Sequence, residues 1–146
     1  MGSAMGSLNF LLDTNAVIFL HKGLLKDPLP PGRMAISFIT EIELRSFPGL
    51  QSEQEAWLAR FLANVQHIGL SHEIKETAIR FRRLHRLRIP DALIAASATL
   101  HGAVLLTNDD QLHKVSELIC RRLELTAPAP GLEKTIAANV AGILEE

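Results

Sequence analysis

The sequence has one cysteine, Cys120, so it cannot form an internal disulfide. Its apolar runs are all much shorter than the roughly 20 residues that cross a bilayer, so we expect no membrane-spanning segment. The net charge of −1 does not indicate a generally basic, nucleic-acid-binding surface. Because the first residues also lack a signal peptide, a reducing cytoplasm is the expected compartment.

Several enzyme signatures are also missing. The sequence contains no G-x-G-x-x-G or P-loop pattern, so it does not indicate a dinucleotide or P-loop nucleotide site. No serine, cysteine or histidine nucleophile stands with an evident base, which disfavours a triad hydrolase. His72 and His113 lack the spacing of metal ligands, so we interpret both as surface residues.

The length and composition predict one globular domain with short extensions. The chain has 146 residues, of which 47% are hydrophobic, enough for a single sizeable core. Residues 1–7, "MGSAMGS", resemble an expression scar, and residues 8–126 form the expected domain. Residues 127–146 hold the linker "APAP" and a predicted helix, whose apolar stripe needs a covering surface, on this domain or on another chain.

Predicted strands alternate with predicted helices along the domain. We expect strands at 8–12, 34–39, 66–70, 103–107 and 120–125. Between them we expect helices at 14–23, 40–47, 53–65, 91–100 and 111–119, with a further long helix after Ser71. This alternation predicts an α/β fold with a mostly parallel central sheet covered by helices on both faces.

Acidic residues recur where the predicted strands end. Asp13, Glu43 and Asp109 follow three strands, and Asp91 opens the helix after "RIP". Ligands of open parallel sheets bind at this edge. Carboxylates gathered there would repel by roughly 4 kcal/mol per pair at ~4 Å and an effective dielectric of ~20, so they would take up protons or cations. Oxygen ligands without cysteine or histidine favour Mg²⁺ or Mn²⁺.

A purely structural interpretation exists for each acid. Asp13 and Asn108 fit helix N-caps, Thr40 with Glu43 fits a capping box, and Asp91 suits the positive end of a helix dipole. Taken singly, each residue favours this interpretation. Capping alone, however, does not require acids to follow successive strands, so the joint pattern favours a metal site.

Four segments together resemble the PIN domain family, and most closely its VapC-type toxins: "LLDTNAVI", "SFITEIEL", "IPDALIAASA" and "LLTNDDQL". The likeness covers roughly residues 8–126 and implies a three-layer α/β/α fold with strand order 3-2-1-4-5. It also implies an Mg²⁺- or Mn²⁺-dependent endoribonuclease. By the same likeness, Glu43 is preferred to Glu41, and Asp109 to Asp110.

The resemblance implies roles for particular residues. The catalytic and metal-binding set would be Asp13, Glu43, Asp91 and Asp109, and Asn15 and Thr107 would orient these ligands. The substrate would be RNA. The partner would be a small VapB-like antitoxin, whose extended segment would cover an apolar groove and send a basic side chain towards Asp13.

Two further features predict binding surfaces. Residues 80–88, "RFRRLHRLR", hold five arginines, and we expect Arg80, Arg83, Arg86 or Arg88 to bind RNA phosphates or an acidic partner. A solvated helical face is the alternative. The apolar stripe of helix 53–65, with Trp57 and Phe61, and the stripe of the 131–146 tail predict a homodimer that also binds the antitoxin.

Two other functional classes stay open at this point. One is a PIN nuclease that is not a toxin and acts in RNA processing or on DNA. The other is a catalytically inactive PIN-like binding module. The intact set of four acids argues against the second class, and metal binding would discriminate it from a nuclease.

Overall fold

The computed structural model describes residues 8–126, so the predicted scar at 1–7 and the predicted linker and helix at 127–146 lie outside the described residues. Eleven helices and strands follow one another along the described chain: β1 (Phe10–Leu12), α2 (Thr14–His21), β2 (Met34–Ser37), α3 (Phe38–Arg45), α4 (Ser52–Asn64), β3 (Gln66–Ile68), α5 (His72–His85), α6 (Ile89–Leu100), β4 (Val104–Leu106), α7 (Asp110–His113) and β5 (Cys120–Arg121).

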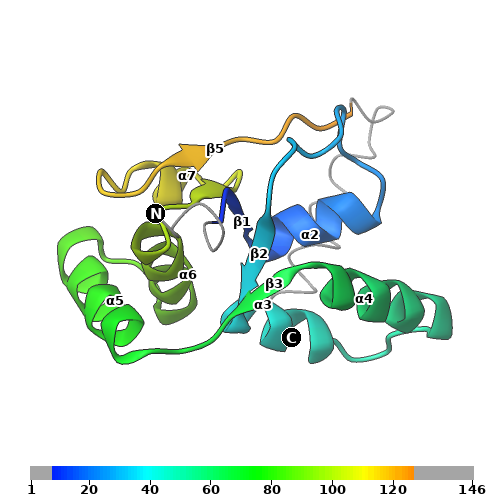
Figure 1. Cartoon of the computed structure of the whole chain (residues 1–146), viewed down its shortest axis with the longest axis horizontal. Coiled ribbons are helices and arrows are strands. Elements are labelled where there is room, and N and C mark those ends of the chain that lie inside the picture. Colours follow the sequence, from blue (N-terminus) through cyan, green and yellow to red (C-terminus); the bar gives the residue numbers. More distant parts are fainter. Residues whose placement is uncertain (1–7, 127–146) are drawn as a thin grey trace, which may run out of the picture.

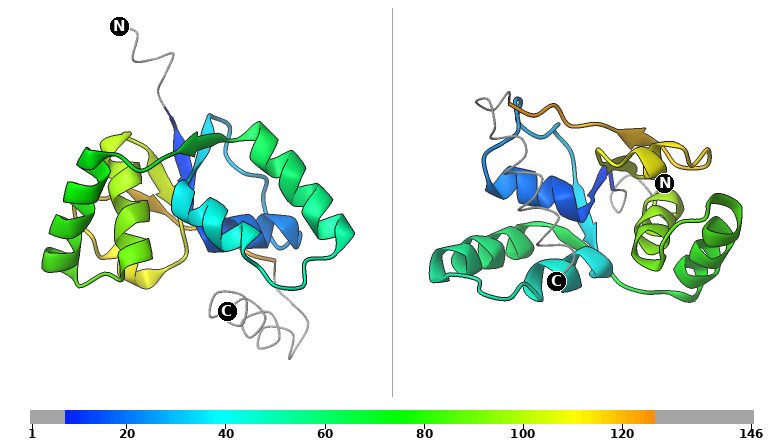
Figure 2. Two further views of the ribbon diagram at one scale, coloured as in Figure 1. Left: turned by 90° about the horizontal axis from the view of Figure 1, so that it is seen from below. Right: turned by 180° about the vertical axis from the view of Figure 1, so that it is seen from behind.

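The five strands form one sheet in the order β3-β2-β1-β4-β5, and every neighbouring pair is parallel. This confirms the predicted strand order and the three-layer α/β/α fold. Figure 1 shows α5 and α6 on one side of the sheet and α2 and α4 on the other, and Figure 2 shows the same division from behind.

Alternation along the strands builds the two cores. Leu11 and Leu105 pack with α5 and α6, whereas their neighbours Leu12 and Leu106 pack with α2 and with Leu58 of α4. Successive strand side chains point to opposite faces, so apolar residues at consecutive positions supply both layers. The central strands β1, β2 and β4 are consequently buried on both faces towards their carboxyl ends, whereas the edge strands β3 and β5 are more exposed.

Several predicted boundaries were wrong, among them the ends of the strands predicted at 66–70 and 120–125, which end at Ile68 and Arg121. The strand at 34–39 ends at Ser37, because the Ser37 hydroxyl accepts the Ile39 amide at 3.1 Å and starts α3. Ser52 with Glu55 in the sequence fits a capping box for the helix predicted at 53–65, but α4 is capped by Gln51 instead, whose amide donates to Gln54 Oε1 at 2.8 Å. The expected helix at 111–119 extends only over Asp110–His113.

The chain after β5 returns across the sheet and is fastened at two places. The amide of Leu123 donates to Asn108 Oδ1 at 2.7 Å, and Asn108 Nδ2 donates to the Leu123 carbonyl at 3.0 Å. Further on, Leu125 pairs antiparallel with Leu25. The Asn108 side chain therefore binds the backbone of this segment instead of capping a helix, as was expected of it. Within residues 8–126, no helix has both the length and the apolarity to cross a bilayer.

Candidate functional site

A pocket of about 310 Å³ opens where β1, β2 and β4 end. All four predicted carboxylates line it: Asp13, Glu43, Asp91 and Asp109. Its other lining residues are Thr14, Asn15, Arg88, Pro90, Ile94 and Leu112. We call it the acid pocket. The structure thus brings together four acids that are spread along the sequence from position 13 to position 109.

Asp13 is both a helix cap and a pocket residue. It follows β1 in extended conformation and caps α2, and its Oδ1 accepts the Ala16 amide at 2.8 Å. Its Oδ2 accepts a hydrogen bond from the Thr107 hydroxyl at the end of β4. A carboxylate stands at the end of a buried strand because two donors from two elements hold it there.

Asp13 is the most strongly perturbed carboxyl of the pocket. Its side chain is nearly buried, at 6% exposure, and burial raises its pKa to about 6. The hydrogen bonds from Thr107 and Ala16 oppose that rise, while the charges of Asp109 and Asp91 add to it. Burial and two neighbouring carboxylates thus disfavour the negative charge of Asp13, and a bound cation would offset both effects.

Glu43 reaches the pocket from α3. The Thr14 hydroxyl donates to Glu43 Oε1, and it lies 3.1 Å from the hydroxyl of Thr40. Ser37, not Thr40, caps α3, so the capping-box explanation of Glu43 was wrong. Thr14 was missed at the sequence level, although its position directly after Asp13 is the feature that could have indicated it.

Asp91 enters from the first turn of α6, as predicted. Burial raises its pKa, the Arg88 guanidinium lowers it and the charge of Asp109 raises it again. The contact with Arg88 joins Nε to Oδ2 at 3.4 Å. Asp91 therefore lies between a cation at the pocket rim and like charges within the pocket.

The adjacent acids Asp109 and Asp110 have different surroundings. Asp109 lines the pocket, and its Oδ1 caps α7 by accepting the Gln111 amide at 2.8 Å. Asp110 instead pairs with Arg122 on the surface, and that contact lowers its pKa. The geometry therefore agrees with the choice of Asp109 over Asp110.

Two supporting residues, Thr107 and Asn15, were predicted, whereas His113, like Thr14, was missed. Thr107 binds Asp13, and Asn15 lines the pocket. The ring Nε2 of His113 lies 2.8 Å from the Thr107 carbonyl, so the half-buried His113 is part of this support and its assignment to the surface was wrong. His72 is exposed, as expected.

The donor set fits a hydrated hard cation. Besides the four carboxylates, the pocket contains Asn15, whose Oδ1 is buried and has no hydrogen-bond partner among residues 8–126. In the same range no three Asp, Glu, His or Cys side chains converge tightly enough to enclose an ion. Mg²⁺ usually keeps several waters and takes only one or two carboxylates directly, so a wide pocket lined by oxygen suits it.

The arginine run has several separate roles. Arg88 lines the acid pocket. Arg80 lies over the Phe81 ring at 5.4 Å, and Arg82 Nε donates to the Leu87 carbonyl at 3.0 Å. Arg86 caps α5 in the left-handed conformation, with φ of 56°. Of the four arginines proposed for phosphate binding, Arg88 therefore has the direct structural connection to the pocket.

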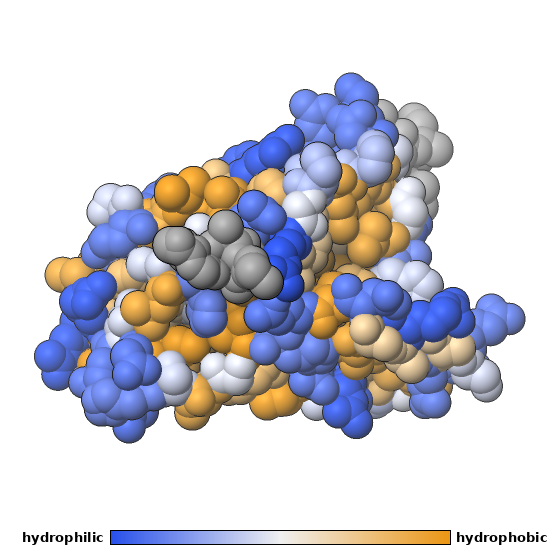
Figure 3. Space-filling view, in the orientation of Figure 1, coloured by the Kyte–Doolittle hydropathy of each residue, from blue (hydrophilic) through white to orange (hydrophobic). Residues whose placement is uncertain are grey.

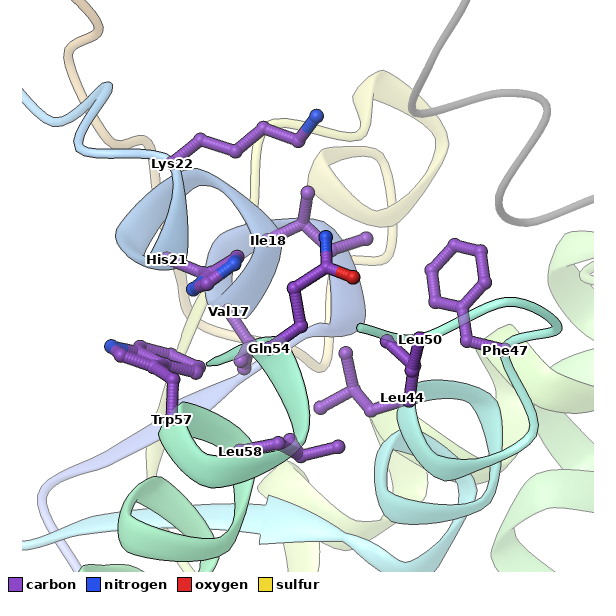
Figure 4. A pocket seen from close by; sticks show the side chains of 10 residues that line it. All are labelled: Val17, Ile18, His21, Lys22, Leu44, Phe47, Leu50, Gln54, Trp57 and Leu58. Carbon is purple, nitrogen blue, oxygen red and sulfur yellow. The ribbon is translucent and has the colours of Figure 1, made fainter. Parts of the chain in front are cut away.

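A second, apolar pocket of about 90 Å³ lies between α2, α3 and α4. It is lined by Val17, Ile18, His21, Lys22, Leu44, Phe47, Leu50, Gln54, Trp57 and Leu58. We call it the apolar groove. In Figure 4, His21 and Trp57 face each other at one end and Phe47 stands at the other, while the Lys22 ammonium points away. Apolar surface over α2 borders the hollow between α2 and α4 in Figure 3.

Aromatic contacts shape one wall of the apolar groove. The Trp57 ring lies 4.6 Å from that of His21, and it stacks on Phe61 at 5.3 Å. Leu58 is the buried residue of α4, whereas Trp57 and Phe61 are only partly buried. Trp57 and Phe61 pack against the core of this face, and their remaining exposure leaves apolar surface at the groove.

Comparison with known proteins gives consistent matches. A family model for the PIN domain matches residues 10–118. The chain is similar to a toxin–antitoxin complex from Klebsiella pneumoniae, with 27% identity and a TM-score of 0.64 over 76% of this chain and 96% of that chain. No curated protein matches it significantly.

Two further solved structures share the fold at lower identity. DNA-bound VapBC from Salmonella typhimurium matches with 23% identity and a TM-score of 0.68, over 79% of this chain and 98% of that chain. VapBC2 from Rickettsia felis, bound to a promoter DNA fragment, matches with 21% identity and a TM-score of 0.67 over the same shares.

Proposed function

The chain belongs to the PIN domain family, and from that premise we propose that it is an Mg²⁺- or Mn²⁺-dependent endoribonuclease, the toxin of a type II toxin–antitoxin pair. The observation that carries the nuclease proposal is the acid pocket, with four carboxylates from four elements and the unpaired Asn15 Oδ1. A divalent ion held there supplies Lewis acidity towards water and phosphate, which phosphodiester hydrolysis needs.

Each residue of the acid pocket has a proposed task. Asp13 is the central ligand, and Glu43, Asp91 and Asp109 complete the site directly or through water. The hydroxyls of Thr107 and Thr14 fix the orientation of Asp13 and Glu43, because each donates to a carboxylate oxygen. Arg88 at the rim binds the phosphate, and Arg80, Arg83 and Arg86 are candidates for contacts with RNA farther from the cut.

The toxin assignment is supported by the Klebsiella pneumoniae complex, whose chain is matched over 96% of its length. A VapB-like antitoxin then needs a surface. The apolar groove suits this partner because Val17 and Ile18 on α2 line it, while Asp13, Thr14 and Asn15 at the start of the same helix line the acid pocket. At 1.5 Å per helical residue, Val17 lies about 6 Å along α2 from Asp13, within reach of an arginine side chain.

A homodimer is also proposed, on a surface other than the predicted one. The stripe of α4 faces the apolar groove, and the stripe of the tail lies outside the described residues. Leu70, Ile79 and Ile89 are all at least 41% exposed and line a hollow of about 300 Å³ between α5 and α6. A two-fold contact is the commonest way to cover such a face.

Light scattering of wild type and of Ile79→Glu tests the proposed homodimer. A wild-type monomer at micromolar concentration would refute the homodimer.

Cleavage assays test the nuclease proposal. The purified chain should cut single-stranded RNA in Mg²⁺ or Mn²⁺, and EDTA or Asp13→Asn should stop cleavage while circular dichroism stays unchanged. Intact RNA with every metal would refute the proposal. Cutting of DNA in preference to RNA would support a different nuclease.

Expression in cells tests the toxin assignment separately. Induced wild-type protein should stop growth, and co-expression of a small protein encoded next to it should restore growth. Growth that is unaffected by an enzyme active in vitro would instead favour a nuclease in RNA processing.

A further inference from the structure

Arg88 is the one cationic side chain among the residues that line the acid pocket. It occupies the N-cap position of α6 in extended conformation, with Pro90 and Asp91 in the first turn. Its guanidinium therefore stands at the mouth of a pocket whose other charged groups are all carboxylates. The four carboxylates attract the Arg88 guanidinium, but they would attract a metal ion as well. The guanidinium and the metal ion therefore compete for the same negative charges.

The contact that holds Arg88 is weak. It consists of one Nε–Oδ2 approach of 3.4 Å to Asp91, and the Arg88 side chain is 84% exposed. An exposed pair without bidentate geometry contributes little to stability. Arg82 differs, because its Nε donates to the Leu87 carbonyl at 3.0 Å and anchors the turn after α5. Among the described residues, the Arg88 side chain has no hydrogen bond as short as that of Arg82.

We propose that Arg88 is a displaceable counter-ion. It pairs with Asp91 in the metal-free protein, releases Asp91 when a divalent cation enters the acid pocket, and then binds the phosphate of the substrate. This inference rests on the proposed function to the extent that the acid pocket is the metal site. It adds a coupling between metal loading and substrate binding, in which one side chain serves both states.

The coupling follows from charge. A guanidinium beside Asp91 repels an incoming divalent cation, so metal binding weakens the ion pair and the ion pair weakens metal binding. Guanidinium groups bind phosphate readily through their planar set of donors. Loss of Arg88 should therefore have opposite effects on the two ligands, with tighter metal binding and weaker RNA binding. A residue that served only to cap α6 would not produce this combination.

Calorimetric titration with Mn²⁺ tests the first effect. The variants are Arg88→Gln and, as the matched control, Arg83→Gln, which removes the same charge from α5 outside the pocket lining. We expect Arg88→Gln to bind Mn²⁺ about three- to tenfold more tightly than wild type, as removal of a like charge a few ångströms away implies. Arg83→Gln should bind Mn²⁺ as wild type does.

Fluorescence anisotropy tests the second effect, using a phosphorothioate RNA that resists hydrolysis. Arg88→Gln should weaken RNA binding more in Mn²⁺ than in EDTA, because only the metal-loaded wild type has released the guanidinium. Equal Mn²⁺ affinity in Arg88→Gln and Arg83→Gln, or an equal loss of RNA affinity with and without metal, would overturn the inference while leaving the nuclease proposal intact. A wild type that binds Mn²⁺ no better than Asp13→Asn would overturn both.

Discussion

Thr107 donates a hydrogen bond from its hydroxyl to Oδ2 of Asp13, although 94 positions separate the two residues. The same hydroxyl accepts the Asp109 amide at 3.1 Å, and the Thr107 carbonyl lies 2.8 Å from Nε2 of His113. Thr107 thus joins two acids and a histidine at the end of β4. The parallel pairing of β1 with β4 makes this possible, because it brings the ends of both strands to the same edge.

Thr107→Val should damage the acid pocket without changing the size of the side chain. It leaves the buried Asp13 carboxylate with one donor fewer and the Asp109 amide without its acceptor, which costs about 1–3 kcal/mol of the free energy of unfolding. The Thr107 hydrogen bond lowers the Asp13 pKa, so its loss should raise that pKa further. Urea denaturation and NMR titration measure both effects. Thr107→Ser keeps a hydroxyl and is the control; if it behaves like the valine variant, the hydroxyl is not responsible.

Asp109→Asn and Asp110→Asn should differ in effect although the residues are adjacent. Asp109 lines the acid pocket, whereas Asp110 is paired with Arg122 at the surface. We expect Asp109→Asn to lower kcat for RNA cleavage by at least tenfold and Asp110→Asn to change it less than threefold. Asp110→Asn should lose only the small stabilisation of an exposed ion pair. If Asp110→Asn lowers kcat more than Asp109→Asn does, Asp110 rather than Asp109 belongs to the site.

The metal-free protein should become less stable as the pH rises from about 4 to 6. Burial raises the Asp13 pKa from 3.8 to about 6, so in this range the native state binds a proton more tightly than the unfolded state. The stability lost by pH 7 is on the order of 3 kcal/mol. Asp13→Asn removes this contribution. The free energy of unfolding of the variant minus that of wild type should therefore increase as the pH rises across the same range. Denaturation in EDTA measures the difference, and a difference independent of pH would show that Asp13 titrates normally.

The parallel sheet and its two helical layers could be predicted because they depend on patterns that a sequence displays, whereas the strand order was implied only by the resemblance to the PIN domain family. Consecutive apolar residues at 10–12 and 104–106 indicate strands buried on both faces, and acids directly after them indicate the functional edge. The short element ends could not be predicted in this way. Ser37 and Thr40 are both suitable caps by residue type, and the structure has Ser37 as the cap of α3, where its hydroxyl accepts the Ile39 amide.

The four acids could be predicted, but the groups that hold them could not all be found. The Thr14–Glu43 contact joins α2 to α3, and the position of Thr14 directly after Asp13 indicates a place near the pocket but not Glu43 as its partner. His113 binds a backbone carbonyl, and a backbone acceptor leaves no trace in the sequence. The sequence does not distinguish Arg88 from the other arginines of the run. Its position at the pocket depends on where the two helices end and begin, at His85 for α5 and at Ile89 for α6.

Arg86→Gly should stabilise the protein. Arg86 follows α5 with φ of 56°, and among the described residues it is the non-glycine residue with positive φ. Helices commonly end on glycine in this conformation, since a Cβ there costs about 1–2 kcal/mol. Some of that gain is offset by the greater freedom of glycine in the unfolded chain, so we expect a net increase of about 0.5–1 kcal/mol in the free energy of unfolding.

Thermal and urea denaturation measure the effect of Arg86→Gly, and Arg83→Gly provides the control within α5. Because Arg83 is helical, glycine there should destabilise by up to about 1 kcal/mol. RNA affinity measured on the same variants separates strain from function, since both remove one positive charge. If Arg86→Gly is more stable but binds RNA more weakly than Arg83→Gly, the strained arginine is retained for its positive charge. If Arg86→Gly is less stable than wild type, the left-handed turn is held by contacts of the Arg86 side chain that outweigh its strain.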